Sequence, residues 1–347
     1  MSPYPSLEEG LIDQLFLTYA GYSIGTDGTP HYQFWETTDF LPLLTHVDAH
    51  TGCVDGTMFT DFLFLALGIL NESGEGRFLT RNEKSPANWA EWVRYLDELF
   101  LCDRNLDALC QAVHRSALST TNVWIALPYP NPQVFTNDLL RVQAVVEWIC
   151  LFLSKWESSP LKCCLHLKGF YWLQESLYEH GGAFDDRFVI KEVNQQIHSL
   201  QVDGCQLKSI WIPYQLAHGW NEWSSLGFDL AFLQPNAYFN PQRSISKAAA
   251  SAYENGMGFE IEFDLAVTYD QAKREKLQEY LRLGATGGTD ENGRYFGPYQ
   301  FESPLAWYTG GWFFGKNGRK QAMVSLYHSN DPLYNQIFAF LNGFTDC

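Results

Sequence analysis

The chain has 347 residues, of which 16% are aromatic, and 23 Lys and Arg against 40 Asp and Glu give a formal net charge of −17. Disordered chains are poor in aromatic residues, so this composition indicates a folded protein. The acidic balance excludes the basic face that a nucleic-acid-binding protein needs, and it makes an anionic membrane surface an unfavourable partner. We therefore expect neutral or cationic partners.

Short apolar runs alternate with longer segments of helical period along the chain. Eight runs predict strands, at 15–22, 58–67, 121–128, 168–173, 209–213, 228–233, 258–263 and 322–328. Six segments predict helices, at 88–100, 105–117, 137–156, 187–200, 241–254 and 269–282. Helices between strands imply parallel pairing, and eight parallel strands predict an α/β fold of the (β/α)8 TIM-barrel type. A doubly wound open sheet is the alternative, but no Gly-x-Gly-x-x-Gly motif follows a first strand.

We expect one barrel domain over residues 1–347, with an N-terminal extension and insertions in the loops that follow the strands. The N-terminus shows no basic run followed by an apolar stretch. This predicts a cytoplasmic protein, or an extracellular one if a leader has been trimmed. The longest apolar run is too short to span a membrane, so we expect no membrane insertion.

The eight cysteines include no Cys-x-x-Cys pair. Cys163 and Cys164 are adjacent, a spacing that suits neither a metal knuckle nor two ordinary disulfides. Most of the others fall in apolar helix or strand patterns. We therefore interpret the cysteines mainly as buried thiols in a reducing compartment.

The seventh predicted strand carries three acids, Glu260, Glu262 and Asp264, which alternate with apolar residues. A period of two puts the acids on one face of the strand and the apolar residues on the other. In a barrel the apolar face packs against helices, so the acids are expected to point inward, with Glu262 and Asp264 nearest the mouth. Burying three like charges would raise at least one pKa. The alternative is a solvent-facing polar edge.

Glu175 follows the fourth predicted strand, where a helix cap or a surface charge is the alternative interpretation. Strands four and seven lie across the mouth of a closed eight-stranded barrel. Glycoside hydrolysis needs two facing carboxylates, one to protonate the departing oxygen and one to attack the anomeric carbon or activate water. We predict Glu175 as general acid/base and Glu262 as nucleophile, with Asp264 and Glu260 as alternative nucleophiles.

Aromatic and polar residues at or near the strand ends predict a substrate-binding surface. Aromatic rings can stack on sugar faces, while amides and carboxylates can bond to hydroxyl groups. Core packing is the alternative for any one aromatic residue, and a cap or a buried hydrogen bond is the alternative for the carboxylate in strand two. The predicted set is Tyr22, Asp61, Tyr129, Trp172, Tyr214, Gln234, Asn236, Tyr238 and His328.

Several of these segments together resemble the bacterial domain-of-unknown-function family 4855. The most distinctive are GFYWLQES at 169–176 and GMGFEIEFD at 256–264. Others lie at 39–42, 62–65, 92–100, 128–130, 211–214, 226–229 and 234–239, in the same order over most of the chain. The resemblance implies a bacterial, glycosidase-like barrel that acts on polysaccharide. Family members are often larger and exported, with additional modules.

The sequence thus predicts a glycoside hydrolase whose partner is a poly- or oligosaccharide and which needs no metal or organic cofactor. The negative net charge favours a neutral or amino-sugar bacterial exopolysaccharide over an anionic one. A non-catalytic carbohydrate-binding barrel is the alternative. A weaker third hypothesis is a metal-dependent hydrolase that uses the i,i+4 pair His46 and His50.

Overall fold

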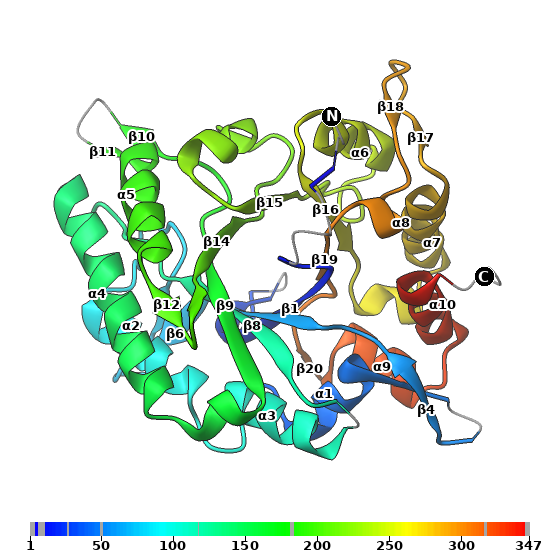
Figure 1. Cartoon of the computed structure of the whole chain (residues 1–347), viewed down its shortest axis with the longest axis horizontal. Helices are drawn as coiled ribbons and strands as arrows, with labels where there is room; N and C mark the ends of the chain where they lie inside the picture. The colour runs from blue at the N-terminus through cyan, green and yellow to red at the C-terminus, as the bar shows by residue number, and fades with distance from the viewer. Residues whose placement is uncertain are drawn as a thin grey trace. The chain divides into compact units, whose positions relative to one another are not determined.

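The computed structural model describes residues 4–5, 11–25, 28–48, 51–116, 118–180, 184–315 and 318–343. Its main sheet contains eight parallel strands, and β1 pairs in parallel with β19 (Figure 1). The predicted (β/α)8 fold class is therefore confirmed. The eight strands are β1 (Gln14–Ile24), β5 (Asp61–Ala66), β8 (Thr121–Leu127), β9 (Leu165–Trp172), β14 (Lys208–Trp211), β15 (Leu230–Leu233), β16 (Gly258–Glu262) and β19 (Leu305–Tyr308).

The chain divides into two compact units, which are described separately. The first unit comprises Met1–Leu17, Thr38–Phe62 and Ala231–Cys347, and the second comprises Thr18–Thr37 and Leu63–Leu230. The expected single domain over 1–347 stays a prediction. In the described part of the chain, no helix has both the length and the apolar character of a membrane span.

Four helices of the second unit follow the predicted periodicity: α2 (Trp89–Leu99), α3 (Asn105–Arg115), α4 (Asp138–Glu157) and α5 (Asp186–His198). Helix α2 begins after a capping box in which the Asn88 side chain accepts from Ala90 N at 2.8 Å and Glu91 accepts from Asn88 N at 2.8 Å. These contacts satisfy backbone donors that the first turn leaves unpaired. Helices α4 and α5 lie side by side (Figure 1).

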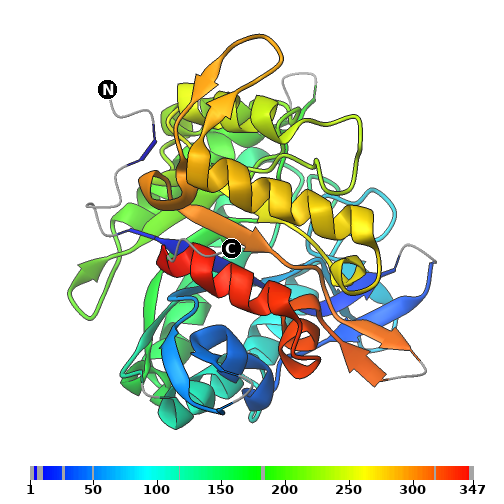
Figure 2. The same cartoon turned by 90° about the vertical axis from the view of Figure 1, so that its right-hand side faces the viewer.

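The first unit packs aromatic rings against its strands β16 and β19. Phe259 of β16 lies 4.7 Å, between ring centroids, from Tyr299, which begins α8 (Tyr299–Glu302). The Trp307 indole of β19 donates to Gln14 Oε1 at 2.7 Å, so that its buried N–H is satisfied. Helices α7 (Gln271–Thr286) and α10 (Pro332–Asn342) contact each other in the same unit (Figure 2).

The eighth strand is not where the sequence pattern placed it. Residues 322–328 form helix α9 (Ala322–His328), and β19 is the eighth parallel strand. A seven-residue apolar run does not distinguish a buried strand from a short buried helix. The helical start is decided by Gln321, whose side chain accepts from Val324 N at 3.2 Å. The correct segment, Leu305–Tyr308, was not predicted, although the equally short strands β14 and β15 were.

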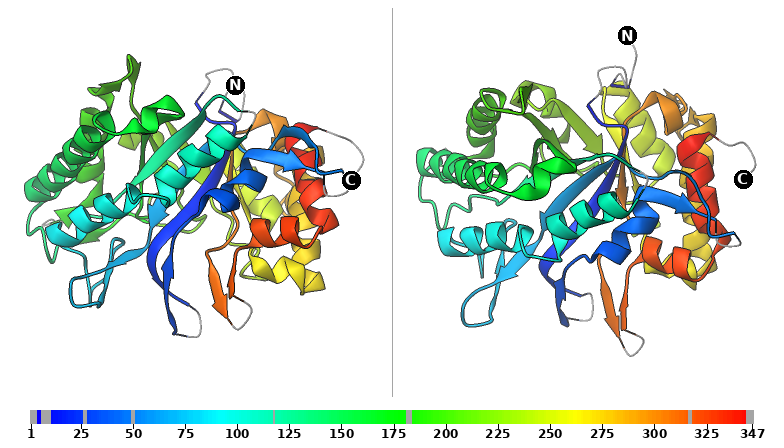
Figure 3. Two further views of the ribbon diagram at one scale, coloured as in Figure 1. Left: turned by 90° about the horizontal axis from the view of Figure 1, so that it is seen from below. Right: turned by 60° about the horizontal axis from the view of Figure 1, so that its bottom comes forward.

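Antiparallel strands extend the second unit beyond the end of β5. Strand β6 (Gly68–Leu70) pairs with β1 and with β7 (Gly76–Phe78), and β2 (Pro30–Gln33) pairs with β1 (Figure 3). A Cβ atom at Gly76 would lie 2.1 Å from the Tyr22 ring. Only glycine therefore allows β7 to pass this close to that tyrosine.

Helix α2 carries a carboxyl group whose ionisation opposes folding. Burial raises the pKa of Glu98 to about 7 from 4.5, although a hydrogen bond from Tyr32 and the charge of Arg94 pull it downward. The folded state therefore binds more protons than the unfolded state between pH 4.5 and 7, and the free energy of unfolding falls as pH rises through this window. At about 1.4 kcal/mol per pKa unit, this rise in the pKa corresponds to a free-energy change on the order of 3 kcal/mol.

We accordingly expect Glu98→Gln to stabilise the protein at pH 8 and to have little effect near pH 4.5. Urea denaturation at both pH values measures this difference. Asp97→Asn is the matched control, because Asp97 is the exposed neighbour on the same helix, paired with Lys155. Equal effects of the two substitutions at pH 8 would contradict a role for burial.

Candidate active site

A cavity of about 830 Å³ lies in the second unit beside the carboxyl ends of β5, β9 and β14. In barrel enzymes this is the end of the strands that carries the chemistry. Glu175 and Tyr214, both predicted site residues, line it. The rest of the lining is mainly polar and aromatic: Tyr19, Leu65, Leu67, Thr80, Arg81, Asn82, Glu83, Lys84, Tyr171, Leu173, Gln174 and Ser176.

Glu175 is half-buried, and the residues on either side of it are fixed by hydrogen bonds. The Gln174 side chain accepts from Arg81 N at 2.9 Å, and its carbonyl accepts from Trp211 Nε1 at 2.9 Å. Ser176 Oγ accepts from His218 N at 3.0 Å. Anchoring both neighbours holds the Glu175 backbone in place, which is what an acid that must meet a substrate oxygen requires.

One wall of the cavity comes from a loop that sequence reasoning did not identify. Residues 80–84 follow β7, and the Arg81 guanidinium lies 3.7 Å above the ring of Tyr178. Asn82 Oδ1 accepts from Lys84 N at 2.9 Å, and Asn82 O accepts from Asn131 Nδ2 at 2.9 Å. The signal was the run of charged residues in this turn, Arg81, Glu83 and Lys84, but no periodicity ties such a loop to a distant strand end.

The other predicted aromatic residues of this unit are packed in its interior. Tyr129 is 2% exposed and its hydroxyl donates to Asp186 at 3.1 Å. Trp172 is 3% exposed and makes an edge contact with Tyr129, with the ring centroids 6.1 Å apart. Tyr22 packs against Phe78. None of these three predicted residues is among those that line the cavity.

In the first unit, the loop after β15 wraps around the carboxylate of Glu262. This side chain is 0% exposed. Its oxygens accept from Asn236 N at 2.8 Å, Ala237 N at 3.0 Å and Tyr280 Oη at 2.7 Å. Burial raises the pKa of Glu262, and the hydrogen bonds from these donors offset only part of that rise. Glu262 therefore serves as an acceptor that shapes the loop after β15.

Asp264 differs from Glu262 because it is half-buried rather than enclosed. Its Oδ1 accepts from Tyr238 Oη at 2.9 Å and from Ala266 N at 2.9 Å, so it caps the short helix η5 (Leu265–Thr268). Burial, together with the charge of Asp264, raises the pKa of Tyr238, which keeps that phenol protonated as the donor. Hydrogen bonds thus connect two predicted residues with the end of β16: Asn236 donates to Glu262, and Tyr238 donates to Asp264.

The remaining predicted residues of the first unit lie in different settings. Glu260 is 1% exposed within β16, and the buried Gln234 Oε1 has no hydrogen-bond partner among the described residues. Asp61 is 2% exposed at the first residue of β5, where it accepts from Thr60 Oγ1 at 3.0 Å. Asp61 therefore lies at the amino end of its strand, away from the end where barrel chemistry occurs.

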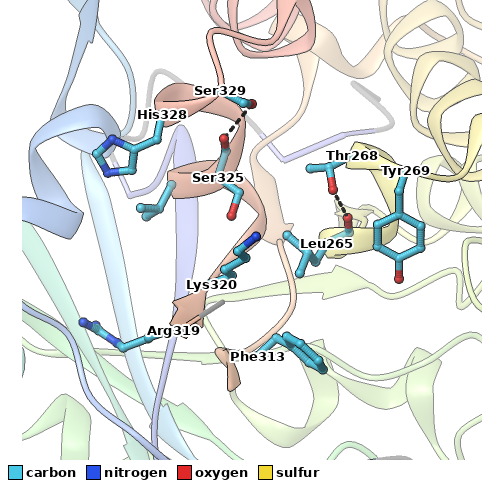
Figure 4. Close-up of a pocket in the computed structure, with 11 residues that line it drawn as sticks. Leu265, Thr268, Tyr269, Phe313, Arg319, Lys320, Ser325, His328 and Ser329 are labelled. Carbon is cyan, nitrogen blue, oxygen red and sulfur yellow. Dashed lines mark hydrogen bonds between the residues drawn. The ribbon is translucent and has the colours of Figure 1, made fainter. Parts of the chain in front are cut away.

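His328 was predicted from its place at the end of a strand, and that premise is wrong because His328 ends helix α9. It is exposed and lines a separate cavity of about 590 Å³ in the first unit. Figure 4 shows its ring on the side of α9 turned away from Tyr269 and Phe313.

His46 lies on strand β3 (Thr45–Val47) rather than on a helix. Its Nδ1 contacts Asp55 Oδ1, its Nε2 lies 2.9 Å from Asn335 Oδ1, and its ring stacks on Phe338. Both ring nitrogens of His46 therefore already contact other side chains of the protein. His50, the other half of the predicted metal pair, lies outside the described residues.

One family profile, described as a domain of unknown function and designated DUF4855, matches residues 23–300. No curated protein matches the chain. Among solved structures, a glycoside hydrolase family 5 enzyme from Prevotella bryantii B14 is similar with a TM-score of 0.46 and 10% identity, over 96% of this chain and 99% of that chain. A similarity at this level says nothing about activity. The family profile covers most of the sequence, so the chain belongs to the DUF4855 family.

Proposed function

We propose that this protein is a glycoside hydrolase in which Glu175 is the general acid/base. One observation carries the proposal. The half-buried carboxyl of Glu175, with both neighbouring residues anchored, lines a polar cavity together with Tyr19, Tyr171 and Tyr214. Tyrosine offers an apolar ring face and a hydrogen-bonding tip, which suits a sugar ring with its hydroxyl groups. A fixed carboxyl among such groups can protonate a glycosidic oxygen.

The proposed substrate is a neutral or amino-sugar polysaccharide, such as a bacterial exopolysaccharide. The cavity lining balances two acids, Glu83 and Glu175, with two bases, Arg81 and Lys84. The whole chain carries a net charge of −17, which repels polyanions at long range. A cavity lining with no net charge, in a chain whose overall charge is negative, therefore favours a glycan without carboxylate or sulfate groups.

The proposed second carboxylate comes from the end of β16, and exposure favours Asp264 over Glu262. A nucleophile or base must come within about 3–3.5 Å of its target atom. Glu262 is fully enclosed by its donors, whereas Asp264 keeps part of its surface open. In this proposal Asp264 is the nucleophile or base. Glu262 holds the loop after β15, and Tyr238 of that loop donates a hydrogen bond to Asp264.

We expect Asp264→Asn to lower kcat by at least ~10³-fold, because the amide can neither attack nor act as a base. Asp270→Asn is the matched control, since Asp270 caps α7 by accepting from Ala272 N at 2.9 Å, much as Asp264 caps η5. Initial rates and circular dichroism of both variants measure the effect. Equal rates in the two variants would mean that Asp264 acts only as a cap.

The burial of Glu262 gives specific support to a second candidate, a non-catalytic carbohydrate-binding barrel. If Asp264 serves only to cap η5, as Glu262 serves the loop after β15, neither acid remains for hydrolysis. Incubation of the purified chain with neutral, amino-sugar and acidic exopolysaccharides separates the two functions. Products detected by chromatography support the hydrolase, and saturable binding measured by calorimetry without products supports the binding barrel.

A further inference from the structure

Three cysteines and one histidine of the second unit converge at a point separate from the cavity. Cys110 and His114 lie on α3, and Cys163 and Cys164 lie at the end of the short helix η2 (Pro160–Cys163). Their four potential ligand atoms all lie within 4.8 Å of one another. Three thiol sulfurs and one imidazole nitrogen gathered this closely are the ligand types of a structural zinc site.

The local structure explains why these particular side chains meet. Cys110 and His114 are four residues apart, so they occupy one face of α3. The turn that carries the adjacent cysteines is held by Cys164 N donating to Leu161 O at 3.1 Å and by Thr121 N donating to Cys164 O at 2.9 Å. This turn also contacts α3.

Three of the four distances between these side chains lie within about 0.4 Å of those between ligands of a tetrahedral zinc ion, and the fourth is about 0.6 Å shorter. Zn–S bonds of ~2.3 Å and Zn–N bonds of ~2.0–2.1 Å place two sulfurs ~3.8 Å apart and a sulfur and a nitrogen ~3.6 Å apart. Cys163 Sγ lies 4.0 Å from Cys110 Sγ and 3.4 Å from Cys164 Sγ. His114 Nε2 lies 3.5 Å from Cys163 Sγ and 3.0 Å from Cys164 Sγ.

We propose that Cys110, His114, Cys163 and Cys164 bind one Zn²⁺ ion as a structural site. Four protein ligands close the coordination sphere, which leaves no open position for water or substrate. The three thiols release their protons to solvent as they bind, and His114 binds through the Nε2 lone pair. Two of the ligands adjoin the amino ends of β8 and β9, the end of a barrel associated with stability.

The adjacent cysteines were interpreted from the sequence as unsuited to a metal knuckle. Cysteine ligands that come from one short segment are typically separated by about two to four residues. Here α3 supplies two ligands, so the turn needs to supply only the adjacent pair. The site thereby links α3 to the connection between α4 and β9, more than forty positions away in the sequence.

Metal analysis and cobalt substitution test the proposal on the intact chain. Protein purified under reducing conditions without chelator should contain about one zinc per chain. After zinc removal, Co²⁺ titration should saturate at one equivalent and give a thiolate-to-cobalt charge-transfer band with the intense visible bands of tetrahedral Co²⁺. Wild-type protein that binds neither metal at micromolar concentrations would overturn the proposal, as would an intramolecular disulfide among these cysteines that persists under reducing conditions.

Cys163→Ser removes one exposed ligand and is expected to weaken Co²⁺ binding by at least ~100-fold, with loss of charge-transfer intensity. Cys102→Ser is the matched control. Cys102 is an exposed thiol near Asp103 and Asp107, which form the other group of potential ligands among the described residues. An unchanged cobalt spectrum in Cys163→Ser, or its loss in Cys102→Ser, would overturn the assignment. Neither result depends on whether the protein hydrolyses glycans.

Discussion

Glu175→Gln should reduce glycan hydrolysis by ~10²–10⁴-fold while leaving glycan binding nearly unchanged. Glutamine keeps the shape and the hydrogen-bonding capacity of the side chain but cannot transfer a proton to the departing oxygen. The neighbours on both sides stay anchored through Gln174 and Ser176, so the backbone should not move. Turnover measured by product chromatography, together with binding measured by calorimetry, separates the chemical step from recognition.

The matched control is Glu83→Gln, which removes the other carboxylate from the lining of the same cavity. The Glu83 side chain is 73% exposed and pairs with Arg81 at 3.2 Å, so its loss should change turnover only a few-fold. If Glu83→Gln abolished turnover and Glu175→Gln did not, the roles of the two acids would be exchanged. If neither changed the rate, this cavity would not be the site of hydrolysis.

Asp186→Asn should destabilise the second unit by about 3–5 kcal/mol, because it removes the fully buried counter-charge of the Arg141 guanidinium and leaves only Asp138, which is 19% exposed, to pair with it. Asp186 and Arg141 form an ion pair in which both side chains are 0% exposed. Asp186 also accepts from Tyr178 N at 2.8 Å and from Tyr129 Oη at 3.1 Å. Urea denaturation followed by tryptophan fluorescence measures the loss in the free energy of unfolding.

Asp185→Asn is the control for this effect, since Asp185 precedes Asp186 and caps α5 with a 43% exposed side chain. Asparagine caps helices about as well as aspartate, so this variant should stay within about 0.5 kcal/mol of wild type. Replacing both Arg141 and Asp186 with apolar residues should recover part of the loss. A single Asp186→Asn variant as stable as wild type would show that the pair contributes no net stability.

Periodicity alone was enough to predict most of the barrel. Long segments such as 88–100 and 137–156 carry several turns of apolar pattern, and they form α2 and α4. The pattern failed at the eighth strand. Residues 322–328 fold as a helix that Gln321 caps, and the four-residue strand β19 was not predicted, although the equally short strands β14 and β15 were. The conformation of a short apolar run depends on contacts with residues that are distant in the sequence, which a local pattern does not reveal.

The candidate site was predictable only in part, for a similar reason. Glu175 was predicted as a site residue because it lies shortly after a strand, and it is among the residues that line the cavity. The loop at 80–84 comes from a separate segment, and nothing in its pattern indicates that Gln174 accepts from Arg81 N. The alternation of acidic and apolar residues correctly predicted that Glu262 is buried. It did not predict that main-chain N–H groups of the loop after β15 would donate to the Glu262 oxygens.

The bonds between Glu262 and that loop have a consequence for variation within the family. Glu262 binds main-chain N–H groups of Asn236 and Ala237, and a main-chain contact does not depend on which side chain the loop residue carries. Only Asn236, with a φ of 55°, restricts its position to residues that tolerate a left-handed backbone. The 41% exposed Phe239 can therefore change while the loop keeps its path. A single buried carboxylate would therefore let family members differ in the exposed side chains of this loop while the barrel strands stay the same.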